Sequence, residues 1–258
     1  MSTTASDAGT TPPGVSVPEL PPAFQVSKRE QKTLPNWALK VAMAITGTFG
    51  ALFLVLHLVG NLKVYTGAEH FNDYALWLRH VGEPLIPANG VIWILRCALA
   101  LCLLVHVTCG VLIWTRGRAA RGKFPAKRNN GFRSVGATLM PFTGCALLVF
   151  IVFHILDLTL GTQPIATADF QDHTETAAFA YQNLVADFSR PWAAAIYLVM
   201  MALLSVHLAH GLFTVVSDLG AVGKRLRAIL IAIGGLLALA ILLGNASIPL
   251  AVQLGVLK

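Results

Sequence analysis

Eight histidines are the residues of this chain whose chemistry best suits a metal or cofactor. Three of them, His70, His80 and His173, stand in polar segments, where we expect them to be solvated. The other five lie inside long apolar stretches: His57, His106, His154, His207 and His210. An ionisable side chain is costly in a membrane-spanning segment, so its presence there predicts a functional site. For any single histidine, the alternative is a hydrogen bond across a helix interface.

The apolar stretches around these histidines are long enough to cross a bilayer. The chain is 55% hydrophobic and only 12% charged, with a mean hydropathy of +0.67. Soluble proteins carry about 25% charged residues, which argues against a soluble enzyme. Runs of about 20 apolar residues span the hydrocarbon core, and they must do so as helices. We therefore predict an all-α polytopic membrane protein with five transmembrane helices, at about 37–63, 91–115, 136–160, 191–217 and 228–250.

The loop charges predict an orientation. One loop carries seven positive charges and no acid: Arg116, Arg118, Arg121, Lys123, Lys127, Arg128 and Arg133. Another basic cluster follows the fourth span, whereas the remaining two loops are acidic. The positive-inside rule then places the N-terminus in the cytoplasm and the C-terminus outside. The net charge of +7 is thereby explained by topology and lipid, with no nucleic-acid partner.

Three segments lie outside the spans and have their own expected roles. Residues 1–36 are rich in Pro, Thr and Ser, which predicts a mobile cytoplasmic segment before the membrane domain of 37–250. We expect residues 251–258 to form an outer tail. Residues 68–80 have amphipathic spacing, which predicts a short helix at the outer membrane interface.

Depth sorts four of the histidines into two pairs. His57 and His154 come late in outward-running helices, so both lie toward the outer face. His106 and His207 lie on returning helices, about 15 Å from the inner ends at 1.5 Å per residue. The spacing also repeats, with 49 residues from His57 to His106 and 53 from His154 to His207. The first four spans therefore look like two pseudo-repeated hairpins, with each pair facing across the axis between them.

A flat ligand on that axis could take one imidazole on each side, and haem b fits this geometry. Iron binds neutral imidazole, and haem proteins commonly use axial histidine. Three glycines share helix faces with the histidines and would let a macrocycle approach the backbone: Gly50, Gly110 and Gly211. The alternative is that these glycines only pack helices closely. Two histidines on each iron leave no open position, which predicts electron transfer rather than oxygen chemistry.

The arrangement resembles a known family. It is similar to the five-helix, two-haem cytochrome b membrane anchor of bacterial succinate:quinone oxidoreductases, the actinobacterial succinate dehydrogenase type in particular. The resemblance covers about residues 37–247 and rests on the order and spacing of the four helical histidines. The matching stretches are Thr46-Gly47 ten residues before His57, HLVGNLKVYTGAEHFNDYALWLRHVG (57–82), LLVHVTCG (103–110), VFHILDLT (152–159) and VHLAHGLF (206–213).

The resemblance implies a function and a ligand set. In this family the ligand on the fourth helix is followed by glycine four residues later, which selects His207 over His210. It implies two haem b groups, menaquinone as the acceptor, and a complex with a flavoprotein and an iron–sulfur subunit at the cytoplasmic face of a bacterial cell membrane. Oxidation of succinate would belong to the flavoprotein, not to this chain. The sequence does not identify the quinone-binding residues.

Three charged residues near the outer face have more than one interpretation. Arg96 and Arg190 could each pair with a haem propionate or extend to the membrane interface. Asp157, one turn beyond His154, could hydrogen-bond a ligand, take up protons, or only mark the interface.

Two other functions are compatible with parts of this pattern. A two-haem anchor of another membrane dehydrogenase, such as a hydrogenase or formate dehydrogenase, would need the same histidines and differ in its docking partner. A histidine-lined metal transporter would need polar residues and broken helices along a path through the membrane. The apolar and mostly uninterrupted spans argue against the transporter.

The two depth-matched pairs predict two b haems per chain, each with two histidine ligands. Pyridine haemochrome analysis of the purified protein, normalised to amino-acid content, should give two haems per polypeptide. A value of one or none would contradict the pairing.

Overall fold

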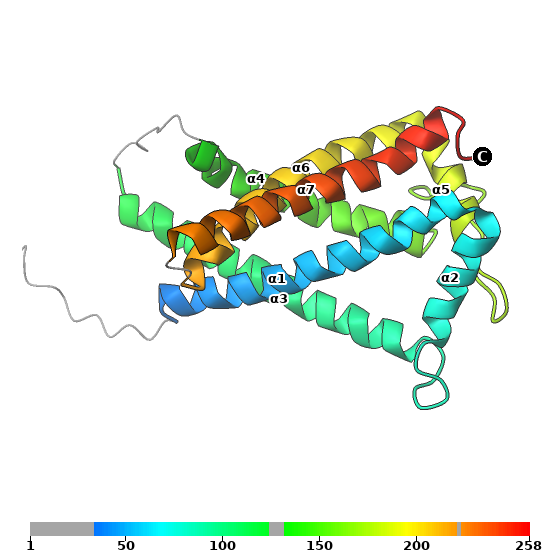
Figure 1. Ribbon diagram of the computed structural model, residues 1–258, viewed down its shortest axis with the longest axis horizontal. Helices are drawn as coiled ribbons and strands as arrows, with labels where there is room; N and C mark the ends of the chain where they lie inside the picture. The colour runs from blue at the N-terminus through cyan, green and yellow to red at the C-terminus, as the bar shows by residue number, and fades with distance from the viewer. Residues whose placement is uncertain (1–33, 124–131, 221–222) are drawn as a thin grey trace, which may run out of the picture. The chain divides into compact units, whose positions relative to one another are not determined.

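The computed structural model describes residues 34–123, 132–220 and 223–258, with side chains from 136 onward in the second range. Within these residues every regular element is a helix (Figure 1). The all-α prediction is therefore confirmed for the described chain. Most of the predicted N-terminal segment 1–36 lies outside it, as do Lys127 and Arg128 of the basic loop.

Five helices are long and apolar enough to cross a membrane, as predicted. They are α1 (Asn36–Asn61), α3 (Gly90–Arg121), α4 (Phe132–His154), α6 (Pro191–Asp218) and α7 (Lys224–Gln253). Helix α3 continues beyond 115, the predicted end of the second span. Arginine and alanine favour helix, so α3 continues through the sequence RGRAAR and carries Arg116, Arg118 and Arg121 on its last turns. At α4 a π-helical turn, η3 (Ile155–Thr159), completes the span.

Four of these helices form a ring whose order determines which faces meet. α1 packs against α3 and α6, α4 packs against α6, and α3 meets α4 over a short stretch. This order places α1 and α4 on one diagonal of the bundle, and α3 and α6 on the other. The predicted histidine pairs therefore stand on opposite corners of the ring, because His57 and His154 lie on α1 and α4 and the other pair on α3 and α6.

The fifth helix, α7, covers the side of the bundle formed by α1 and α6. Ala238 and Ile241 of α7 are almost fully buried against Leu208 and Ala51. By contrast, the outer faces of the helices carry exposed apolar side chains, such as Leu101 and Leu104 of α3. Such a surface suits hydrocarbon as its solvent, because no backbone polar group of a helix is left unpaired there.

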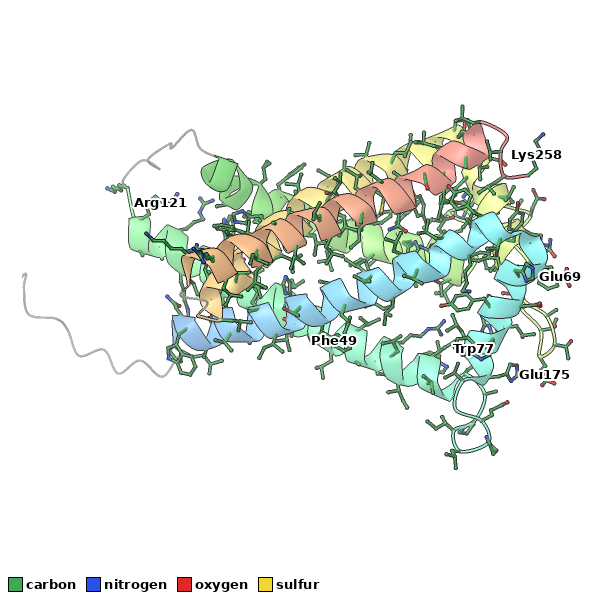
Figure 2. The ribbon with its side chains drawn as sticks, in the orientation of Figure 1. Phe49, Glu69, Trp77, Arg121, Glu175 and Lys258 are labelled. Atoms are coloured by element: carbon green, nitrogen blue, oxygen red, sulfur yellow. The ribbon has the colours of Figure 1, made fainter. Side chains whose placement is uncertain are left out.

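Short helices gather at one end of the bundle. η2 (Leu62–Thr66) leads into α2 (Ala68–His80), which packs on α5 (Ala180–Phe188). The sequence predicted α2 with these bounds, whereas α5 was missed. Figure 2 shows Glu69, Trp77, Glu175 and Lys258 toward this end, with Arg121 at the other. We call the two ends the α2–α5 end and the Arg121 end.

If the five apolar helices cross a membrane, the Arg121 end and the α2–α5 end lie on opposite sides of it. Single cysteines replacing the exposed residues Lys123, Glu175 and Lys258 would report this in a chain whose four native cysteines are serine. In intact cells a membrane-impermeant maleimide should label the cysteines at positions 175 and 258. The cysteine at position 123 should be labelled only after the cells are permeabilised. Labelling in the reverse order would contradict the charge-based orientation.

Candidate haem-binding site

The structure brings the four histidines together as two pairs. The ring centres of His57 and His154 are 6.0 Å apart, and those of His106 and His207 are 6.5 Å apart. An axial imidazole nitrogen lies about 2 Å from a bound metal and the ring centre about 1 Å further out, so two rings on one metal have centres about 6 Å apart. Both separations therefore fit a single iron held between two imidazoles.

The two pairs lie at different levels of the bundle. Thr46 of α1 contacts His106, and His57 follows Thr46 on the same helix by eleven residues. On the other side of the ring, Thr143 of α4 contacts His207 and precedes His154 by eleven residues. Eleven helical residues span about 16 Å, so the pairs are separated by roughly half of a bilayer core. His57 and His154 lie nearer the α2–α5 end.

Hydrogen bonds at Nδ1 fix which nitrogen of His106 carries the proton. Nδ1 lies 3.2 Å from the carbonyl oxygen of Met43 and 3.3 Å from Thr46 Oγ1. A carbonyl only accepts, so Nδ1 must be the donor. The neutral ring then has its lone pair on Nε2, the nitrogen that remains for a metal. Metal-binding histidines commonly donate their second nitrogen in this way, which orients the ring.

The same interaction recurs at His207. Its Nδ1 lies 3.0 Å from Thr143 Oγ1, and the threonine hydroxyl is positioned to donate to the carbonyl oxygen of Leu139 or Met140. The hydroxyl oxygen therefore accepts from Nδ1–H, and Nε2 again keeps the lone pair. Thr143 is 1% exposed, so no water competes for this bond.

A repeated sequence signal explains the two equivalent contacts. Thr46-Gly47 stands ten residues before His57, and Thr143-Gly144 stands ten residues before His154. In each copy the threonine contacts a histidine of the His106–His207 pair: Thr46 contacts His106, and Thr143 contacts His207. Only the first copy contributed to the prediction, although an internal Thr-Gly repeat in the sequence also marks the second.

The glycines divide into two groups. A Cβ on Gly47 would approach His106 Cε1 to 3.1 Å, and one on Gly144 would approach His207 Cε1 to 3.5 Å, so both let a ring lie against the helix. The predicted haem contacts behave differently. Gly50 and Gly211 face open space, and the nearest atom to a Cβ on Gly110 would be 3.9 Å away. A side chain at these three partly buried glycines would therefore meet no close neighbour within the chain.

His154 is oriented by a different set of partners. Its Nδ1 lies 3.2 Å from the hydroxyl of Tyr197, which donates to Asp157 Oδ2 over 3.0 Å. Arg190 donates to Asp157 Oδ1 over 3.1 Å and also forms an ion pair with Asp187. Within the chain the Arg190 guanidinium thus forms ion pairs with two carboxylates, and its predicted propionate contact stays a prediction. Asp157 is thus connected to His154 through the Tyr197 hydroxyl rather than directly.

Arg96 belongs to a positively charged group outside the histidine pairs. Its guanidinium lies 5.0 Å from the ring centre of Trp93. Burial, and then the charge of Arg96, lower the pKa of Arg79 on α2. Partial burial and the charge of Arg79 also lower the pKa of His173, against the opposing effect of Asp172. These cations favour an anion such as a propionate or a lipid phosphate.

His210 has a separate place from the pairs. A Cβ on Gly136 of α4 would lie 2.5 Å from His210 Nδ1, so this ring lies against the α4 backbone. Its ring centre is 6.2 Å from that of Phe213. The ring facing His106 is that of His207, as the family resemblance implied.

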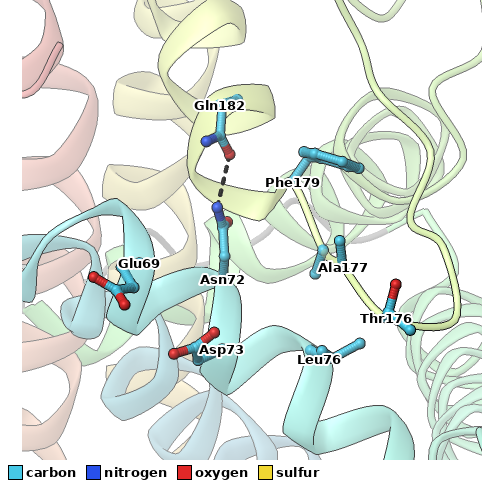
Figure 3. Close-up of a pocket in the computed structure, with 9 residues that line it drawn as sticks. Glu69, Asn72, Asp73, Leu76, Thr176, Ala177, Phe179 and Gln182 are labelled. Carbon is cyan, nitrogen blue, oxygen red and sulfur yellow. Dashed lines mark hydrogen bonds between the residues drawn. The ribbon is translucent and has the colours of Figure 1, made fainter.

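A hollow of about 270 Å³ lies between α2 and residues 176–182 (Figure 3). Glu69 and Asp73 line one side, and Asn72 donates to Gln182 Oε1 across it over 2.9 Å. None of the four paired histidines lines this hollow. It therefore belongs to the packing of α2 against α5 and not to the histidine site.

No family model, curated protein or solved structure matches the chain in the comparisons made with known proteins. The resemblance to the cytochrome b anchors therefore rests on the sequence stretches quoted above.

Single substitutions should separate the two levels. His106→Ala and His207→Ala should remove one haem, and His57→Ala and His154→Ala the other, because each pair would share one iron. His210→Ala should leave both haems and serves as the matched control. The measurement is the haem content of each purified variant, together with the α-band of its reduced absorption spectrum at low temperature.

The outcome that would contradict this assignment is specific. If His210→Ala removed a haem that His207→Ala retained, the choice within this pair of histidines would be wrong.

Proposed function

We propose that this chain is the membrane-anchor cytochrome b subunit of a succinate:menaquinone oxidoreductase. Its role is to carry electrons from a cytoplasmic iron–sulfur subunit to quinone. The observation that carries the proposal is the pair of ring-centre separations, 6.0 and 6.5 Å, at two levels of one bundle. When bound, a haem b at each level would supply a centre that accepts and releases one electron.

The chain's own residues hold and orient these groups. His106 and His207 keep Nδ1–H hydrogen-bonded, which leaves Nε2 of each ring available to a metal. His154 does the same with Tyr197 as acceptor. Glycines at both levels leave room along the helix faces. The shared Thr-Gly contacts support the interpretation of α1–α3 and α4–α6 as two copies of one hairpin.

The helices themselves favour an electron carrier over a metal transporter. A transporter needs discontinuous helices around a polar path. Here α1, α3 and α6 run without interruption through the levels of the histidines, and α4 ends only at His154. Two imidazoles on each iron would also leave no site where a transported ion could exchange ligands.

The Arg121 end has the charge expected of a cytoplasmic face that meets a soluble partner. Arg116 donates to Asn36 Oδ1, and the Arg118 guanidinium lies 5.1 Å from the ring centre of Trp114. With Arg121 and Lys123 they form a basic group at the end of α3. Anionic lipid would bind each such charge by about 1 kcal/mol, so a test must separate lipid from protein.

Neutralising Arg116, Arg118, Arg121 and Lys123 to glutamine should reduce co-purification of a flavoprotein and an iron–sulfur subunit in mild detergent. Succinate–quinone activity of the membranes should fall with it. The matched control exchanges arginine and lysine at these four positions, which keeps the charge and should keep the complex. Maleimide labelling at position 175 verifies that topology is unchanged.

Undiminished assembly in the glutamine variant would show that this surface serves lipid or topology instead. If a hydrogenase or formate dehydrogenase co-purified instead, the chain would still be a two-haem anchor, but of a different dehydrogenase.

A further inference from the structure

The two histidine pairs differ in what accepts the Nδ1 proton. At the His106–His207 level the acceptors are neutral: the Met43 carbonyl and two threonine hydroxyls. At the His57–His154 level the acceptor is the Tyr197 hydroxyl, and a carboxylate stands directly behind it. Among the described residues, a buried carboxylate is connected by hydrogen bonds to one pair only.

The group behind His154 is held rigidly and away from water. Asp157 is 1% exposed and Tyr197 6%. Three aromatic rings surround the tyrosine, with ring-centre distances of 5.1 Å to Phe150, 6.0 Å to Phe153 and 4.8 Å to Phe188. Arg190 fixes the carboxylate from the other side over 3.1 Å. The tyrosine hydroxyl is therefore positioned by its packing and by the carboxylate together.

A hydrogen bond from Nδ1–H to a polarised acceptor makes an imidazole a stronger electron donor. Tyr197 gives its proton toward a carboxylate, so its oxygen becomes more negative and accepts more strongly from His154. A more basic axial ligand stabilises the oxidised form of a bound metal relative to the reduced form. The neutral acceptors of His106 and His207 should increase the basicity of their imidazoles less.

We infer that Tyr197 and Asp157 are positioning residues that act through His154 and lower the reduction potential of the centre held by His57 and His154. The inference rests on the proposed function, because it requires a metal between the two rings. A purely structural role, in which the cluster only ties η3 to the start of α6, would leave the potential unchanged.

The test is a potentiometric titration of single-haem proteins. In a His106→Ala background, which keeps the centre of His57 and His154, Tyr197→Phe preserves the ring packing and removes the hydroxyl. The reduced-to-oxidised ratio of this haem at a fixed ambient potential should rise several-fold. In the reciprocal His57→Ala background, Tyr197→Phe should leave the remaining haem unchanged. Tyr74→Phe, at the same end of the bundle, is the matched control and should change neither.

Asp157→Asn provides a second variant that keeps the shape of the carboxylate and should shift the ratio in the same direction. If the Tyr197→Phe protein retains too little haem to titrate, the potential of the Asp157→Asn protein tests the inference. An unchanged potential in these variants, with the haem still bound, would overturn the inference and leave the proposed function standing. Absence of haem from the wild-type chain would instead overturn the proposed function.

Discussion

An imidazole placed among apolar helices must have a partner for each of its two nitrogens, and the arrangement of this bundle follows from that requirement. A neutral histidine has one nitrogen that donates and one that accepts. In His106, His154 and His207 the donor is satisfied by a neighbouring helix at Nδ1. The remaining nitrogen needs a second partner, and a metal shared with the other histidine of the pair would satisfy two such nitrogens at once.

The order of helices around the ring makes this sharing geometrically possible. Direct neighbours such as α1 and α3 pack too closely to enclose a large ligand, whereas diagonal helices face each other across the bundle centre. A helix that carries a Thr-Gly pair contacts a neighbouring helix through its threonine and the diagonal helix through its histidine. Thr46 on α1 orients His106 on the neighbouring α3, while His57 on the same helix faces α4. One helix thus serves both levels, which couples their positions.

Much of this architecture could be predicted because the bilayer imposes simple rules on sequence. Span length, loop charge and 1.5 Å of rise per residue were sufficient for the five helices and for sorting the histidines by depth. The amphipathic α2 was predicted for the same reason, since its apolar residues recur at helical spacing. The helix bounds differ from the predicted spans by a few residues where a helix continues beyond the apolar stretch, as α3 does.

The parts that escaped prediction depend on contacts between distant segments. α5 is short and its role is clear only when it packs on α2 and α6. Arg190 and Asp157 are 33 residues apart, and nothing local signals their ion pair. The partner of His154 was missed because Tyr197 lies 43 residues away on another helix. Thr143-Gly144 was a readable signal that was overlooked.

The central claim is that four histidines saturate two iron centres. Low-temperature electron paramagnetic resonance of the oxidised, purified chain tests it most directly, because axial ligation sets the spin state of ferric haem. Our account predicts two low-spin signals of comparable intensity, with no high-spin component. A dominant high-spin signal, or a single low-spin species, would contradict it.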